Sequence, residues 1–240
     1  MIYTQIHIPK TAGSTIRKLT SNTNNFQLFK PNPSSSTIGH PENAESVEDQ
    51  IGNKREEHCI FCSIRNPIDW YVSLYNHKMK SNVSKVKDYP IMEGNTFDDY
   101  FQDLVLMNNG IEGCRKWFKP FFKYHEEIFH FINGNAGCYT MFFAYYCFRN
   151  WRKILSSEDI NLEIIHRFKD SLAVDFILPI ENLQNSFEKM MESNATSCYI
   201  DFSLKVNACP HKPSLEYYSQ EQLDMLSKAD QSIFKLFNYK

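Results

Sequence analysis

Two segments of the chain have the hydrophobic pattern of a β-strand, and each leads through a short turn into a helix. Residues 3–8 alternate apolar and polar positions and contain β-branched residues, which predicts a strand that stops at Pro9. Residues 58–64 are apolar almost throughout, a pattern typical of a central parallel strand that is buried on both faces. Helices are predicted for residues 16–19 and 68–80, so both segments are predicted to be strand–turn–helix units.

The rest of the chain continues this alternation of strands and helices. Further strands are predicted at residues 26–29 and 173–178, and we expect the second of these to be buried. Further helices are predicted at residues 42–50, 96–107, 180–192 and 220–236, and residues 117–151 are mostly helical apart from 133–137. The fold class is therefore α/β, with a P-loop-like central parallel sheet flanked by helices.

Length and composition favour one domain. The chain has 240 residues, of which 42% are hydrophobic, and nothing in the sequence forces a split, so residues 1–240 are expected to form a single domain. No stretch approaches the roughly 20 apolar residues of a membrane span. No signal peptide is visible before the first strand. We therefore expect a soluble, cytoplasmic protein without a transmembrane segment, or a soluble domain of a longer protein.

Charge and cysteine content narrow the possible functions. The net charge of −2 argues against a protein that holds nucleic acid by bulk electrostatics, although individual basic residues can still bind a small anion. Seven scattered cysteines do not suggest a full disulfide framework. Cys59 and Cys62 form a C-x-x-C pair, but the pair lies inside the apolar segment 58–64, and no second pair stands at zinc spacing. We expect both to be buried free thiols.

The turn after the first strand is rich in groups that bind anions. Its sequence is Pro9-Lys10-Thr11-Ala12-Gly13-Ser14-Thr15. Several backbone N–H groups, a helix N-terminus and a lysine converge there, which is what an oxyanion of the phosphate type requires. The turn is not a Walker A loop, because Lys10 precedes Gly13 whereas the Walker lysine follows the glycine. The alternative is a tight turn that carries a surface lysine.

The end of the second strand offers another anion site. Arg65 follows the strand directly, at the edge where open α/β sheets bind their ligands, and Ser73 lies two turns along the next helix. An arginine fork and a hydroxyl group suit a second phosphate. Alternatively, Arg65 pairs with Asp69, and Ser73 is a small residue at which helices pack.

Together, the two segments resemble the donor-binding segments of the carbohydrate-type sulfotransferases. Residues 6–13 resemble the 5′-phosphosulfate loop of that family, and residues 65–67, with Asp69 and residues 72–76, resemble its 3′-phosphate segment. Weaker similarity follows in the family's order at residues 174–177, 181–183, 187, 210–214, 217–218, 230 and 234–239. Residues from about 80 to 165 match no pattern of the family and are interpreted as an aromatic-rich helical insertion that forms an acceptor lobe.

The resemblance implies a cofactor and a place for it. The family's sulfuryl donor is 3′-phosphoadenosine 5′-phosphosulfate (PAPS), its product is 3′-phosphoadenosine 5′-phosphate (PAP), and no metal is required. Arg65 and Ser73 would hold the 3′-phosphate. Lys212, in a loop over the nucleotide, is either a second phosphate contact or an exposed lysine. The 5′-phosphosulfate would be held by Lys10 and by the amides of Thr11, Ala12, Gly13, Ser14 and Thr15.

The resemblance also suggests catalytic residues. Sulfuryl transfer is an in-line displacement that needs a cation beside the bridging oxygen and a base near neutral pH. Lys10 is the candidate cation. Ile38-Gly39-His40 resembles the family's glycine–histidine base position, so His40 is the candidate base, with an ordinary loop histidine as the alternative. Since some sulfotransferases use a carboxylate, the other candidate bases are Glu56, Glu57 and Glu181. His7 is interpreted as a structural histidine beside the site, and His77 as a packing or surface residue.

Two positions depart from the family's pattern. Trp70 stands where the family often has a basic residue, so one expected ion pair is absent. The order Ser14-Thr15 reverses the usual order of threonine and serine, but both hydroxyl groups remain.

The sequence says much less about the acceptor than about the donor. The resemblance favours a glycan or another hydroxyl-bearing molecule. The aromatic residues of 117–151 could stack on sugar rings and the basic residues of 115–153 could attract an acidic acceptor, but such patterns are more typical of a core and a solvated face. The rival functions are a nucleotide-dependent kinase, disfavoured by the position of Lys10 and by the lack of an evident magnesium site, and a non-catalytic nucleotide- or glycan-binding module.

Overall fold

The structure is a computed structural model. It describes residues 1–20, 26–28, 43–81, 95–118, 127–132, 134–195, 202 and 211–240, with the backbone alone for residues 26–28, 80 and 81. Contacts divide the chain into two compact units. Unit 1 comprises Met1–Arg65, Tyr145–Asn150 and Lys169–Ala208, and unit 2 comprises Asn66–Ala144, Trp151–Phe168 and Cys209–Lys240. The single domain expected for residues 1–240 stays a prediction.

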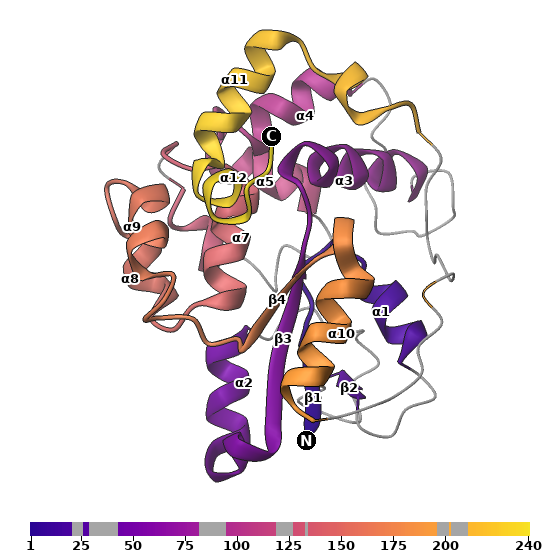
Figure 1. The fold of residues 1–240 in the computed structure, drawn as a ribbon. Coiled ribbons are helices and arrows are strands. Elements are labelled where there is room, and N and C mark those ends of the chain that lie inside the picture. The colour runs from indigo at the N-terminus through magenta and orange to yellow at the C-terminus, as the bar shows by residue number, and fades with distance from the viewer. Residues whose placement is uncertain are drawn as a thin grey trace. The chain divides into compact units, whose positions relative to one another are not determined.

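Unit 1 is built on a four-stranded sheet with the order β2-β1-β3-β4, in which all the neighbouring strands are parallel (Figure 1). The strands are β1 (Ile2–Ile6), β2 (Phe26–Leu28), β3 (His58–Ile64) and β4 (Phe176–Pro179). β3 lies between β1 and β4, and its residues from Cys59 onward are buried. The predicted central parallel strand is therefore confirmed, and with it the α/β class.

The helices of unit 1 lie close to the predicted positions, except that α1 begins three residues earlier than predicted and η1 was not predicted. They are α1 (Gly13–Leu19), α2 (Ala44–Ile51), the short 3₁₀ helices η1 (Gly52–Glu57) and η2 (Ile180–Asn182), and α10 (Leu183–Ser193). Phe187, Met190 and Met191 have the spacing of one helix face and pack with Tyr3 and Phe61 of the sheet. Burial of these apolar side chains is the main force that holds α10 on the sheet.

The C-x-x-C pair is structural, as predicted. Both Cys59 and Cys62 are buried free thiols. Burial raises the pKa of the Cys59 thiol to about 12, so that it stays protonated and unreactive at neutral pH.

The expectation of a buried strand at residues 173–178 is wrong in extent. β4 begins only at Phe176 and is an edge strand among those described, with Leu178 as its one buried residue. The preceding residues pair elsewhere: the Ala173 N–H donates to the Cys147 carbonyl at 2.8 Å, and Leu172 bridges Phe148. Pairing with a segment distant in sequence competes with the sheet, which a local apolar pattern cannot reveal.

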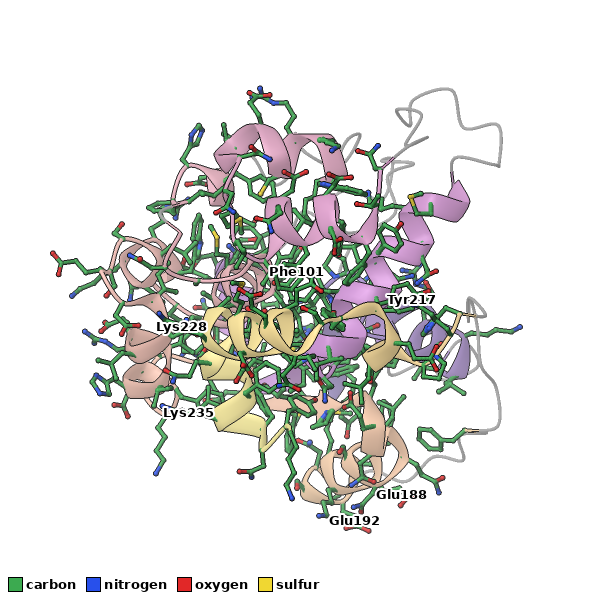
Figure 2. All side chains as sticks on the ribbon, turned by 90° about the horizontal axis from the view of Figure 1, so that it is seen from above. Phe101, Glu188, Glu192, Tyr217, Lys228 and Lys235 are labelled. Atoms are coloured by element: carbon green, nitrogen blue, oxygen red, sulfur yellow. The ribbon has the colours of Figure 1, made fainter. Side chains whose placement is uncertain are left out.

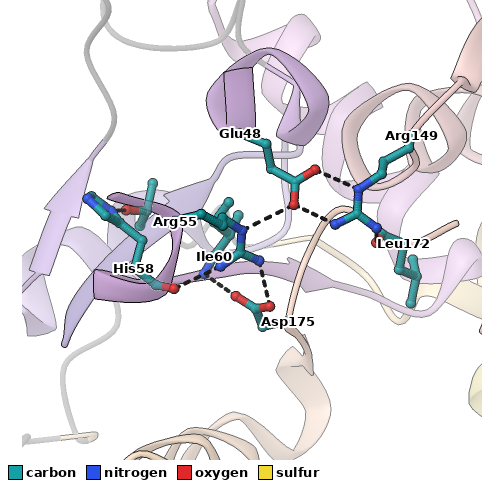
Figure 3. A network of polar contacts seen from close by, with 8 residues as sticks. Glu48, Arg55, His58, Ile60, Arg149, Leu172 and Asp175 are labelled. Carbon is teal, nitrogen blue, oxygen red and sulfur yellow. Dashed lines mark hydrogen bonds and ion pairs between the residues drawn. The ribbon is translucent and has the colours of Figure 1, made fainter. Parts of the chain in front are cut away.

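A chain of ion pairs holds the amino end of this sheet (Figure 3). Glu48 of α2 accepts hydrogen bonds from Arg149 Nε at 2.7 Å and from Arg55 Nε at 3.1 Å. Arg55 Nη2 lies 2.6 Å from Asp175 Oδ1, and Asp175 Oδ2 accepts from the Ile60 N–H at 2.8 Å. The alternating charges satisfy one another across four segments, so Arg149, a basic residue considered for the acceptor, is already paired with Glu48.

Unit 2 is helical. Its helices are α3 (Pro67–Ser81), α4 (Phe97–Leu104), α5 (Gly110–Phe118), α7 (Cys138–Cys147, whose last three residues belong to unit 1), α8 (Trp151–Leu155), α9 (Ile160–Arg167), the 3₁₀ helix η3 (Ser214–Tyr217), α11 (Gln220–Ala229) and α12 (Gln231–Phe237). The sequence predictions did not include α9, η3 or most of α5 and α8. Within the described part of the chain, no helix is both long and apolar enough to span a membrane.

Aromatic side chains form the core of unit 2. Trp70 stacks on Tyr139 with ring centroids 4.4 Å apart, and Trp117 packs edge-on against Tyr100 at 4.8 Å. Phe101 is also fully buried, whereas Lys228 and Lys235 point outward from α11 and α12 (Figure 2). The interpretation of the described aromatic residues as core is confirmed. Trp70, which replaces a basic residue of the family's pattern, is a packing residue here.

The helix predicted over residues 220–236 is wrong as a single element, because Asp230 divides it into α11 and α12. The Asp230 side chain is fully buried, and Oδ1 accepts a hydrogen bond from the Thr140 N–H at 2.9 Å. A Cβ atom on Gly137 would lie 2.8 Å from that oxygen and 2.7 Å from Tyr71 Oη, so this site also requires the glycine. A buried carboxyl must find partners, and Thr140, which supplies one here, lies 90 residues earlier in the chain.

Asp230 gives the stability of the protein a pH dependence that an asparagine variant removes. Burial raises the pKa of the Asp230 carboxyl from 3.8 to about 6, although hydrogen bonds from Thr140 and Tyr71 act in the opposite direction. Because the pKa is higher in the folded state, the contribution to stability is fully present below about pH 4 and is lost as the pH rises through about 6. The total loss is on the order of 3 kcal/mol, about half of it between pH 5 and pH 8.

The measurement is urea unfolding of the unchanged protein and of Asp230→Asn at pH 5 and pH 8. We expect the variant to gain stability relative to the unchanged protein as the pH rises. Asp224→Asn, an exposed aspartate on α11, is the matched control and should not change the pH dependence. Parallel pH profiles for the unchanged protein and Asp230→Asn would contradict the prediction.

Candidate functional site

Both candidate anion segments of unit 1 follow the carboxyl ends of strands, at the same end of the sheet. In the register of β1 and β3, Ile6 pairs with Cys62, so the turn after β1 and Arg65 after β3 both follow carboxyl ends of neighbouring strands. β2 lies on one side of β1 and β3 on the other, so the strand order reverses at β1. Open α/β sheets bind ligands outside the carboxyl ends at this switch point.

The backbone of the turn after β1 has the form of an anion cradle. Lys10 has φ 65° and Ala12 has φ 62°, both in the left-handed region that residues other than glycine rarely adopt. Such residues cost on the order of 1–3 kcal/mol each and cluster at functional sites. Ala12 in the left-handed conformation followed by Gly13 at the start of α1 is the alternation that turns successive N–H groups to one side.

Two buried hydroxyl groups, those of Thr11 and Ser63, hold this turn in place by hydrogen bonds. Thr11 Oγ1 donates to the Ile8 carbonyl at 2.8 Å, and Ser63 Oγ of β3 donates to the Thr11 carbonyl. The side chains of Thr11 and Ser63 are both fully buried. The Thr11 hydroxyl is therefore committed to the fold, and only its amide remains for the role predicted from the resemblance.

Sequence reasoning missed Ser63, although the sequence carries a signal for it. Ser63 is the only hydroxyl residue in the apolar segment 58–64, and it stands near the carboxyl end of that strand. A polar side chain in a strand buried on both faces must have a hydrogen-bond partner, and this position directs it to the edge where ligands bind.

The His7 ring lies against Gly13. A Cβ atom at Gly13 would stand 2.2 to 2.8 Å from three atoms of the imidazole, a separation that real Cβ atoms do not show. The half-buried His7 thus packs under the first residue of α1, in agreement with its interpretation as a structural histidine beside the site.

The remaining predicted donor-binding residues belong to different parts of the chain. In unit 1, Ser14 and Thr15 are half-buried in the first turn of α1, and Arg65 is half-buried after β3. In unit 2, Ser73 is half-buried on α3. Lys212 lies with Nζ 4.4 Å from the centre of the Tyr217 ring and donates to the Glu216 carbonyl, so a phosphate contact requires its release from this turn. Their roles toward a cofactor stay predictions.

The structure separates the candidate bases. Glu56 and Glu57 are exposed in η1, which precedes β3, and therefore lie at the amino edge of the sheet, opposite the switch point. Glu181 is exposed in η2, directly after the carboxyl end of β4, and keeps its place as an alternative. His40 lies outside the described residues, as do residues 205–210 of the loop that carries Lys212.

Among the described residues, no cluster of three or more histidine, cysteine, aspartate or glutamate side chains could hold a metal ion. The described basic residues proposed for an acidic acceptor are largely paired: Arg152 Nε lies 2.6 Å from Glu127 Oε1, and Lys116 Nζ lies 3.4 Å from Asp103 Oδ2. These pairs agree with the interpretation of a solvated, charged face.

The sheet, the turn after β1 and Arg65 after β3 have the arrangement of an α/β protein that binds a nucleotide-type ligand at the switch point. Residues 3–240 match a family model described as "Sulfotransferase family", and the chain belongs to this family. It is therefore an enzyme that transfers sulfuryl groups and depends on PAPS. No curated protein and no solved structure gave a match. The kinase and the non-catalytic module are set aside by this membership.

Proposed function

We propose that the enzyme transfers the sulfuryl group of PAPS to a hydroxyl group on a carbohydrate, with Lys10 stabilising the leaving group and His40 acting as the base. The observation that carries the proposal is the strained, lysine-bearing turn at the switch point of the sheet. The matched family supplies the donor, and the resemblance of residues 6–13 and 65–76 to the donor segments of carbohydrate-type sulfotransferases supplies the acceptor class.

The residues of the turn fit the 5′ end of the donor. Left-handed Lys10 and Ala12 bend the backbone around the start of α1, and the His7 ring lies against Gly13 where a side chain would stand. When bound, the donor supplies an activated sulfuryl group. The amides of residues 11–15 would hold its 5′-phosphosulfate, and Arg65 with Ser73 would hold its 3′-phosphate.

The chain's own groups have two tasks in an in-line displacement. Negative charge grows on the bridging oxygen as the bond to sulfur breaks, and the Lys10 ammonium can stabilise that charge where it develops. The acceptor hydroxyl must lose a proton, and histidine titrates close enough to neutral pH to accept it. His40 takes this task in the proposal, and Glu181 is the alternative.

Calorimetric titration tests the donor site. We expect PAP to bind and ATP with magnesium to bind at least tenfold more weakly, because only PAP carries phosphate at both the 5′ and the 3′ position. Tight binding of ATP with magnesium, without binding of PAP, would contradict the proposal.

The roles of base and acceptor are then tested by turnover. We expect His40→Gln to lower kcat about 100- to 10,000-fold while PAP affinity changes less than twofold. Glu181→Gln is measured in parallel. If kcat falls in this variant but not in His40→Gln, the base is Glu181 and not His40. A screen of desulfated glycans and small phenols with radiolabelled donor decides the acceptor class.

A further inference from the structure

Ser63 makes a contact that joins the two strands of the donor site from within the sheet. Its hydroxyl group donates to the carbonyl of Thr11, and its oxygen lies 3.1 Å from Thr11 Oγ1. Each hydroxyl group has one proton. Since that of Thr11 goes to the Ile8 carbonyl at 2.8 Å, the bond to the Thr11 carbonyl uses the proton of Ser63. The two protons can therefore be assigned in one way: the Thr11 hydroxyl donates to the Ile8 carbonyl, and the Ser63 hydroxyl donates to the Thr11 carbonyl.

This bond fixes a peptide plane of the turn. In a trans peptide the carbonyl and the following N–H lie in one plane and point in opposite directions. Because Ser63 holds the Thr11 carbonyl toward β3, the N–H of Ala12 points the other way, away from the bond with β3. Ala12 is one of the two left-handed residues of the turn, so its orientation needs support from outside the turn.

We propose that Ser63 is a positioning residue for the 5′-phosphosulfate loop, and that its hydroxyl group orients the loop amides that meet the 5′ end of the nucleotide. This inference rests on the proposed function of that loop. Ser63 is two residues from Arg65, so the strand that leads to the residue predicted for the 3′-phosphate also holds the loop predicted for the 5′-phosphosulfate.

The test compares two ligands that differ only at the 5′ position. PAP carries a 5′-phosphate, whereas adenosine 3′-monophosphate does not. We expect Ser63→Ala to weaken PAP binding about tenfold and to leave binding of adenosine 3′-monophosphate within twofold, since the lost bond acts on the 5′ loop alone. Isothermal titration of both ligands gives the ratio of the affinity for PAP to the affinity for adenosine 3′-monophosphate. A general loss of stability does not change this ratio.

Thr4→Val is the matched control. Thr4 is as fully buried as Ser63, and its hydroxyl group also bridges β1 and β3, to His58 Nδ1 at 2.9 Å, but at the amino end of the sheet. We expect this variant to leave the ratio of the two affinities within twofold. Urea unfolding of both variants shows whether their stabilities are comparable. Should Ser63→Ala fail to fold, Ser63→Cys is the substitute, because it keeps the side-chain volume and has a much weaker hydrogen-bond donor. It should also lower the affinity for PAP relative to that for adenosine 3′-monophosphate.

The outcomes separate the inference from the proposed function. An unchanged ratio in Ser63→Ala, or an equal change in Thr4→Val, would overturn the role of Ser63 while leaving the donor site in place. If the unchanged protein binds PAP no more tightly than adenosine 3′-monophosphate, the 5′ loop has no phosphate-binding function, and both proposals fall.

Discussion

Replacing Lys10 with methionine is expected to slow sulfuryl transfer about 100- to 1,000-fold while PAP binding weakens much less. The charge on the bridging oxygen exists only in the transition state, and an interaction made only there lowers kcat rather than raising KM. Lys10 follows Pro9 in the strained turn after β1 and is half-buried, so its backbone is fixed and its side chain is only partly solvated. Single-turnover measurements with saturating PAPS report this step.

Two further variants define the role of Lys10. Lys10→Arg keeps the charge but replaces a compact ammonium with a planar fork, and we expect it to recover only part of the lost rate. Lys18→Met removes an exposed lysine from α1 and is the control for a change of net charge, with kcat expected to stay within twofold. A rise in KM at constant kcat in Lys10→Met would assign Lys10 to ground-state binding instead.

Gly13→Ala is expected to weaken PAP binding by at least 100-fold, against the direction that helix propensity alone would predict. Alanine is the better helix former by up to about 1 kcal/mol, so an unobstructed Gly13→Ala would stabilise the start of α1. Here the new methyl group would stand 2.2 Å from the nearest atom of the His7 ring, so either the ring or the loop must move. A misplacement of about 1 Å can cost about 100-fold in rate, and we expect a loss of similar size in PAP affinity.

A second substitution can relieve the clash. In the double variant Gly13→Ala with His7→Ala, the methyl group no longer meets the imidazole, and we expect PAP affinity to recover at least tenfold relative to Gly13→Ala. Gly52→Ala is the control: φ is +52°, so it costs about 1 kcal/mol of stability, but no atom lies within 4 Å of the new methyl group. If Gly13→Ala binds PAP normally, the contact between Gly13 and His7 does not shape the loop.

The two strand–turn–helix segments could be predicted from local pattern. β1, β3 and the helices that follow them are short-range features, in which Pro9 and Pro67 stand at the boundaries and the apolar period decides the type of element. The donor segments were found in the same way, because both directly follow a predicted strand. Such features depend on residues within a few turns of one another.

The place of Glu56 and Glu57 at the amino end of the sheet follows from the strand predicted directly after them, at residues 58–64. Other features could not be predicted locally. The extent of β4 depended on pairing between Ala173 and Cys147, which lie 26 residues apart. A competing partner elsewhere in the chain decides such cases, and propensity cannot report it.

The sequence by itself determined the parallel α/β class and the two segments that indicate the donor, because periodicity, turn residues and short motifs depend on residues that are close together in the sequence. Only the tertiary structure decided that Ser63 holds the carbonyl of Thr11, that His7 excludes a side chain at Gly13, and that Asp230 breaks the last helix. The physical reason is the same for all three. A buried polar group or a close contact is defined by its partner, and these partners come from other elements of the fold.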